Sequence, residues 1–208
     1  MTRYALSLLL GYFVGSLPTA YLLVKWKTRL DIRKTGSGNV GAMNTFEVTG
    51  SKLLGAIVML LDLLKGVAAV GLSWMLVGEE FWIIGIGGLG SIIGHTYPIW
   101  LKFKGGRGLS TAAGMMLVLG WIFVVVWCTL WTVVYVTSKN IHASNITASM
   151  ITPVVIAVTP TDLVRVTLPL FIGANNFIYL SIILCLLLLL GHREPIAELL
   201  KSFNKKNL

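Results

Sequence analysis

Long apolar stretches separated by short polar segments dominate this chain. They cover residues 4–24, 53–77, 81–101, 112–136, 147–158 and 166–191. A helix needs about 20 apolar residues to cross a bilayer. Only 12% of the residues are charged, whereas soluble domains have about 25%. With no internal repeat or long linker visible, we expect an all-α polytopic membrane protein that forms a single domain over residues 1–208.

Lysine and arginine cluster in three polar segments, 25–34, 102–107 and 193–206. Cytoplasmic loops of membrane proteins carry an excess of these residues, so we expect all three segments, including the C-terminus, on the cytoplasmic side. Segments 102–107 and 193–206 must then be separated by an even number of membrane crossings, yet three apolar runs lie between them. A break near Gly120 gives seven crossings with the N-terminus outside. Five crossings, with 147–158 and its neighbour forming one traverse, is the alternative; we favour about seven transmembrane helices, some of them short.

The net charge of +9 does not indicate a nucleic-acid partner. The basic residues lie in short loops between apolar runs, which fits orientation signals and contact with membrane lipids or anionic substrates. No His/Cys cluster has the spacing of metal ligands, so we expect no metal.

A glycine-rich basic loop covers residues 104–111, between two apolar runs. Its glycines permit positive φ and bring backbone N–H groups close to a ligand, and its cations and hydroxyls suit a phosphate. A basic turn that only sets orientation is the alternative for this segment taken alone. The candidate phosphate-binding residues are Lys104, Gly105, Gly106, Arg107, Gly108, Ser110 and Thr111.

A second glycine-rich segment follows the first apolar run. Its candidate binding residues are Gly36, Ser37, Gly38, Asn39, Gly41 and Asn44. Because both loops are expected on the cytoplasmic side, we expect them to converge near the membrane surface. Such a site suits two phosphorylated small molecules, with a fatty chain lying among the apolar helices.

Placing an ionisable side chain inside the membrane costs free energy, so such residues in apolar runs are often functional. Asp62 and Lys65 lie three residues apart, on one helical face, and for them we favour a structural ion pair that ties helices together. His95 lies beside the basic loop, where an interfacial and a functional role both stay open. No Gly-x-Ser-x-Gly elbow or His-x-x-x-x-Asp dyad is present. The sequence therefore offers few side chains that could act as a general base. The catalytic candidates are Ser37, Asn39, His95 and Lys104.

Several motifs, in order, resemble the bacterial acyl-phosphate:glycerol-3-phosphate acyltransferases. They are residues 31–44, Asp62-Leu63-Leu64-Lys65-Gly66, Gly94-His95-Thr96-Tyr97-Pro98 running into Phe103-Lys104-Gly105-Gly106-Arg107-Gly108, and His192-Arg193-Glu194. The resemblance covers nearly the whole chain, and it adds His192 to the binding candidates.

The resemblance implies an enzyme of the bacterial inner membrane that catalyses the first step of phospholipid synthesis. It would transfer a fatty acyl group from acyl phosphate to the sn-1 hydroxyl of glycerol 3-phosphate, giving lysophosphatidic acid and phosphate without a cofactor. In such enzymes the glycine-rich loops hold the phosphates, and a substrate phosphate takes the hydroxyl proton. Catalysis then rests on positioning and charge stabilisation. We leave the oligomeric state open, with a monomer sufficient for such a site.

This chain departs from the family pattern at Met43, Glu47, Arg107 and Pro195. Arg107 keeps the charge of the usual lysine, whereas Glu47 places a negative charge where an anion-binding arginine is expected. We therefore expect a divergent paralogue with altered substrate preference or lowered activity. The alternative function is a membrane binder or carrier of phosphorylated metabolites without acyl transfer, but the few charges in the spans argue against a translocation path.

Overall fold

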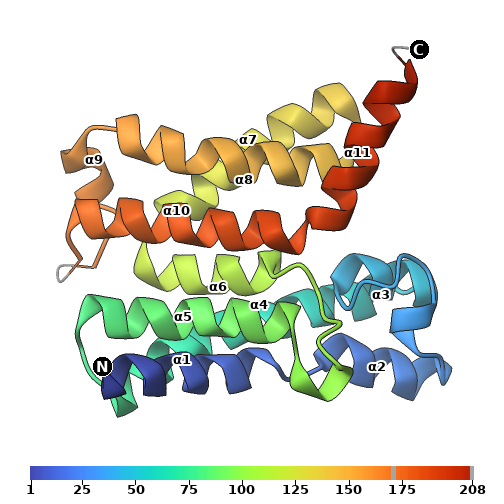
Figure 1. Ribbon diagram of the computed structural model, residues 1–208, viewed down its shortest axis with the longest axis horizontal. Helices are drawn as coiled ribbons and strands as arrows, with labels where there is room; N and C mark the ends of the chain where they lie inside the picture. The colour runs from blue at the N-terminus through green and yellow to red at the C-terminus, as the bar shows by residue number, and fades with distance from the viewer. Residues whose placement is uncertain (170–171, 207–208) are drawn as a thin grey trace. The chain divides into compact units, whose positions relative to one another are not determined.

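The computed structural model describes residues 1–169 and 172–206, and no strand occurs among them. Its helices are α1 (Thr2–Gly15), α2 (Thr19–Thr28), η1 (Ile32–Lys34), α3 (Ala42–Thr49), α4 (Lys52–Leu76), α5 (Phe81–Thr96), η2 (Ile99–Leu101), α6 (Leu109–Leu119), α7 (Ile122–Ser138), α8 (Ile141–Val158), α9 (Thr161–Arg165), α10 (Ala174–Gly191) and α11 (Arg193–Lys206) (Figure 1). The all-α prediction is confirmed. Residues 170 and 171 of the predicted run 166–191 lie outside the described residues.

Within the described residues, four helical stretches are long and apolar enough to cross a membrane. They are Thr2–Thr28, Lys52–Leu76, Ile141–Val158 and Ala174–Gly191. Helices α6 and α7 are shorter apolar helices, separated at Gly120. The break predicted in the run 112–136 is therefore confirmed, whereas the number of crossings and their orientation stay predictions.

Two features of the N-terminal region differ from the prediction. The run 4–24, expected as one helix, is interrupted between α1 and α2 at Ser16, Leu17 and Pro18. Proline lacks an N–H and disfavours helical backbone in the residue before it, which explains the break. The segment that follows contains α3, which was not predicted because Gly41 and Asn44 near its start are poor helix formers.

The chain forms two compact units, Met1–Val118 and Leu119–Leu208. In the first unit α1 packs along α5, and α4 packs against both (Figure 1). Small residues permit the α1–α5 contact, since a Cβ atom at Gly11 or Gly15 would overlap the backbone of Gly87 or Ser91. Such small-residue contacts are typical of helices packed in membranes. In the second unit α8 packs against both α7 and α10.

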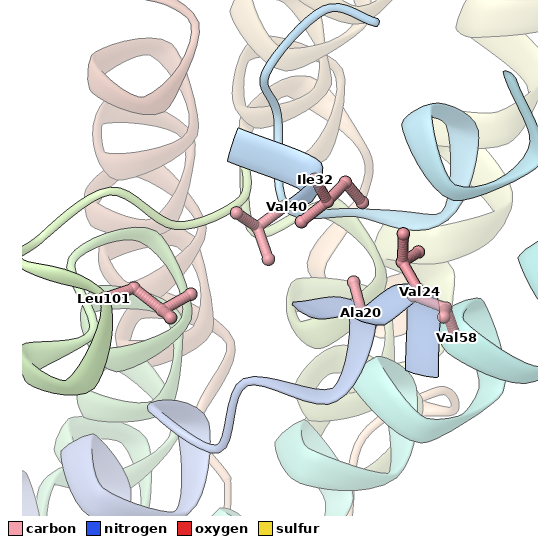
Figure 2. Packing of buried hydrophobic residues seen from close by; sticks show 6 residues of the cluster. All are labelled: Ala20, Val24, Ile32, Val40, Val58 and Leu101. Carbon is pink, nitrogen blue, oxygen red and sulfur yellow. The ribbon is translucent and has the colours of Figure 1, made fainter. Parts of the chain in front are cut away.

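A buried apolar cluster lies beneath both glycine-rich loops of the first unit. It consists of Ala20, Val24, Ile32, Val40, Val58 and Leu101 (Figure 2). Val40 belongs to the first loop, and Leu101 closely precedes the second. Burial of a side chain of this size stabilises a fold by about 1.5–3 kcal/mol. The cluster therefore holds both loops at their bases.

Candidate functional site

The two glycine-rich loops contact each other directly. The N–H of Val40 donates to the carbonyl oxygen of Gly105 at 3.2 Å, and a Cβ atom at Gly106 would lie against the carbonyl oxygen of Val40. The second loop is also held to the end of α5. The N–H of Gly105 donates to the Thr96 carbonyl, and the N–H of Gly106 to the His95 carbonyl, each at 3.1 Å. The loops that were expected to converge thus form one surface.

Asn44 shapes the first loop from inside. Its Nδ2 group donates to the carbonyl oxygens of Ile32 (3.2 Å), Thr35 (3.1 Å) and Asn39 (2.9 Å). Its Oδ1 atom accepts the N–H of Ser37 at 2.9 Å. The side chain is only 1% exposed. Asn44 was predicted to bind substrate, but both ends of its amide are used by the loop backbone.

The other predicted loop residues differ in exposure. Ser37 and Lys104 are exposed, whereas the half-buried ones are Gly38, Asn39, Gly105, Arg107 and Ser110. Left-handed backbone, which favours glycine, occurs at Gly36 (φ 61°), Gly38 (φ 71°) and Gly108 (φ 80°). Gly41 is the N-cap of α3, and α6 begins directly after Gly108. The first N–H groups of α6 therefore follow Lys104 and Arg107 in the chain, an arrangement that suits an anion.

Thr111 lies apart from this surface. Its side chain is fully buried, and its hydroxyl has no hydrogen-bond partner within the described residues. A Cβ atom at Gly66 of α4 would overlap the Thr111 carbonyl oxygen. The structure therefore places Thr111 in the packing of α4 against α6, and its role in phosphate binding stays a prediction.

An arginine links the start of the first loop to the second. The Nε and Nη2 atoms of Arg33 donate to Asp31 at 3.0 and 2.7 Å, and Nη1 donates to the Leu101 carbonyl at 3.4 Å. The hydrogen bond from Arg33 lowers the pKa of Asp31 to about 2. The same hydrogen bond raises the pKa of Arg33, so the pair stays ionised near neutral pH.

Two of the four departures from the family pattern, Met43 and Glu47, lie on α3. Glu47 and Met43 are one turn apart, and both are exposed. Glu47 is therefore accessible to solvent on α3, the helix that begins directly after the first loop.

The intramembrane acid and base form the expected ion pair on α4. The Nζ atom of Lys65 lies 2.7 Å from Oδ1 of Asp62, and both side chains are buried. Lys65 also donates to the Leu17 carbonyl at 2.6 Å and to Thr19 Oγ1 at 2.9 Å. Because Leu17 lies in the break between α1 and α2, the pair ties that break to α4. His95 lies next to this pair, with Nδ1 3.6 Å from Oδ1 of Asp62.

His192 lies in the second unit, whereas the two loops lie in the first. Its Nδ1 atom is 2.7 Å from the Leu188 carbonyl oxygen, and its Nε2 atom is 3.4 Å from Nδ2 of Asn145. Asn145 in turn accepts a hydrogen bond from Nε1 of Trp131 at 2.7 Å. This chain of polar contacts joins α7, α8 and the end of α10. Sequence reasoning assigned no role to Asn145 or Trp131, although a tryptophan N–H in an apolar run requires an acceptor.

A metal ion bound within the described parts of the chain would need several side-chain ligands close together. No three His, Cys, Asp or Glu side chains lie close enough there to hold a metal ion. The functional groups that the loops do offer are backbone N–H groups, hydroxyls, amides and cations.

Comparison with known proteins identifies several relatives along nearly the full chain. The family described as "Glycerol-3-phosphate acyltransferase" matches residues 5–202. A glycerol-3-phosphate acyltransferase of Rhodopseudomonas palustris (strain HaA2) is 38% identical over 196 residues, which cover 94% of this chain and 91% of the relative. One from Thermotoga petrophila is 34% identical over 198 residues, which cover 95% and 93%.

Solved structures agree with these relatives. The crystal structure of PlsY (YgiH), an integral membrane glycerol 3-phosphate acyltransferase, in its glycerol 3-phosphate form has a TM-score of 0.77 and 28% identity. The match covers 96% of this chain and 92% of that chain. The lysophosphatidic acid form of the same enzyme gives a TM-score of 0.76 and 27% identity with the same coverage.

Proposed function

Since the chain belongs to the glycerol-3-phosphate acyltransferase family, we propose that it transfers a fatty acyl group from acyl phosphate to the sn-1 hydroxyl of glycerol 3-phosphate. The products are lysophosphatidic acid and inorganic phosphate. The observation that carries the proposal is the contact of the two glycine-rich loops through Val40 and Gly105. It brings together two surfaces suited to phosphate, as a reaction between two phosphorylated substrates requires. The ligands named for PlsY, glycerol 3-phosphate and lysophosphatidic acid, are a substrate and a product of this reaction.

The two loops take different substrates in this proposal. The loop 104–108 holds the phosphate of the acyl donor, where the cations of Lys104 and Arg107 and the start of α6 stabilise its negative charge. The loop 36–44 holds glycerol 3-phosphate, with the Ser37 hydroxyl and the Asn39 amide as donors. Asn44 keeps the first loop in shape and does not contact substrate.

The reaction needs little from a side-chain base. The sn-1 hydroxyl oxygen attacks the acyl carbonyl carbon, and the bond between that carbon and the phosphate oxygen breaks. The hydroxyl proton passes to a phosphate oxygen, and the phosphate leaves. The protein contributes positioning of the two substrates and stabilisation of the charge that develops on the leaving phosphate.

We place the protein in the bacterial cytoplasmic membrane with about seven crossings, an outer N-terminus and cytoplasmic loops, and a monomer is sufficient for this site. Trp26 and Trp100 support this placement of the loops at the membrane surface. Both are exposed, and they lie within two residues of Lys25 and Lys102. Exposed aromatic residues beside cations are typical of the boundary between membrane and water.

The direct test is an assay of the purified protein with palmitoyl phosphate and glycerol 3-phosphate, measuring released phosphate and the acylated product by mass spectrometry. We expect both products in equal amounts, and only when both substrates are present. Binding of glycerol 3-phosphate without acylated product would instead support the binder or carrier. Phosphate release that does not require glycerol 3-phosphate would point to hydrolysis.

A further inference from the structure

A buried polar cluster lies behind the second loop, and the proposed reaction does not use it. Oδ1 of Asp62 accepts from Lys65 Nζ at 2.7 Å and from Thr19 Oγ1 at 2.8 Å, and His95 Nδ1 lies 3.6 Å from it. All three ionisable side chains are less than 10% exposed. Lys65 pairs with Asp62 and also donates to Thr19 Oγ1, so the carboxyl group is held from two sides. The cluster therefore holds a fixed carboxylate directly beside an imidazole.

His95 connects that carboxylate to the loop. Its carbonyl oxygen accepts the N–H of Gly106 at 3.1 Å. Its Nε2 atom also lies against Gly106, so closely that a Cβ atom there would overlap it. The imidazole therefore packs directly against the backbone of Gly106, which is next to Arg107 and two residues from Lys104. The same residue thus contacts Gly106 through both its ring and its backbone carbonyl.

The space around the cluster excludes substrate. A cavity lined by Asp62, Lys65 and His95, among others, has a volume of about 10 Å³. That volume holds about one water molecule. An acyl phosphate or glycerol 3-phosphate does not fit, so any effect of Asp62 on the reaction must pass through another residue.

We propose that Asp62 is a positioning residue that acts through His95 on the phosphate-binding loop 104–108. It holds Nδ1 of the imidazole on the carboxylate side, so that Nε2 and the His95 carbonyl together fix Gly106. This inference rests on the proposed function, because that loop is the one assigned to the acyl phosphate. The ion pair with Lys65 stabilises the break between α1 and α2, and it also supplies the fixed charge that orients His95.

The test compares Asp62→Asn with Thr19→Val, each alone and with His95→Gln. Asp62→Asn should raise KM for acyl phosphate about tenfold, equivalent to about 1.4 kcal/mol, with a much smaller change in kcat. In the His95→Gln background it should add nothing, because coupled residues are not additive. Thr19→Val removes a donor to the same oxygen and should lower the unfolding temperature while leaving KM unchanged.

A second readout requires no turnover. Inorganic phosphate should raise the unfolding temperature of the wild type and of Thr19→Val, and much less that of Asp62→Asn. If Asp62→Asn does not fold, Asp62→Asn combined with Lys65→Met removes both buried charges together and is measured in the same way. Equal KM for Asp62→Asn and wild type, or a full Asp62→Asn effect in the His95→Gln background, would overturn the inference. A wild type that binds phosphate but forms no acylated product would overturn the proposed function alone.

Discussion

The N–H of Val40 donates to the carbonyl oxygen of Gly105 at 3.2 Å, and this bond joins two loops separated by about 65 residues of chain. Val40 is also part of the buried apolar cluster at the base of the loops. The bond therefore fixes the second loop relative to the first and to the helices beneath. In an enzyme that joins two phosphorylated molecules, that fixed separation sets the distance between the hydroxyl and the acyl carbonyl. A small error in such positioning lowers the rate strongly.

Gly105→Ala should disrupt this junction. A Cβ atom at residue 105 would overlap the carbonyl oxygens of His95 and Thr96, so the loop must move. Overpacking of this kind costs about 1–3 kcal/mol. We expect a lower unfolding temperature and a KM for acyl phosphate raised at least severalfold, measured by denaturation and phosphate release. Gly71→Ala is the control, because nothing lies within 4 Å of a Cβ atom there. Equal behaviour of the two variants would contradict the loop packing.

Comparison of Ser37→Ala with Asn44→Asp should distinguish a residue that binds substrate from one that stabilises the loop. The exposed Ser37 side chain can be removed with little effect on the unfolding temperature, but glycerol 3-phosphate should bind more weakly. In Asn44→Asp an oxygen replaces Nδ2 and faces the carbonyl oxygens of Ile32, Thr35 and Asn39. Buried polar groups left without partners cost about 1–3 kcal/mol each. We therefore expect Asn44→Asp to lower the unfolding temperature clearly; an unchanged value would exclude the scaffold role.

The sequence predicted the all-α class, the break at Gly120 and the convergence of the two loops, because these follow from hydropathy, glycine and the placement of charge. It missed the short helix α3 and the interruption between α1 and α2. It did not predict which polar side chains face inward. The role of Asn44 depends on three carbonyl groups that only the folded loop brings together. His192 likewise has one ring nitrogen near its own helix and the other near Asn145, 47 residues earlier in the chain. An asparagine or a histidine is a residue type that often binds substrate, but these contacts of Asn44 and His192 are with other parts of the protein. Only the tertiary structure reveals such contacts.

Lys104→Gln should weaken binding of the acyl donor more than that of glycerol 3-phosphate. Loss of a hydrogen bond to a charged group costs about 1.5–3 kcal/mol, so KM for acyl phosphate should rise by about ten- to a hundredfold. Lys102→Gln is the matched control, since Lys102 is also exposed and lies two residues away. It removes the same charge without changing the loop that begins at Lys104. Equal effects of the two substitutions would show general electrostatic attraction in place of a specific contact.

Glu47→Arg should improve use of glycerol 3-phosphate. Glu47 is exposed on α3, which begins directly after the first loop, so its negative charge repels an incoming phosphate through solvent. Reversing the charge replaces repulsion with attraction. Because charges separated by about 10 Å or more are largely screened at 0.1 M salt, the gain should be severalfold at low ionic strength and small at high ionic strength.

The matched control for this charge reversal is Glu79→Arg, at the turn between α4 and α5. Glu79 is also exposed, but it lies beyond the opposite end of α4 from the first loop. Its reversal changes the net charge by the same amount and should leave KM for glycerol 3-phosphate unchanged. The measurement is KM for glycerol 3-phosphate at several salt concentrations for both variants. A gain in Glu47→Arg that does not depend on salt would indicate a direct contact with the phosphate, and no gain would show that Glu47 lies outside the field of the site.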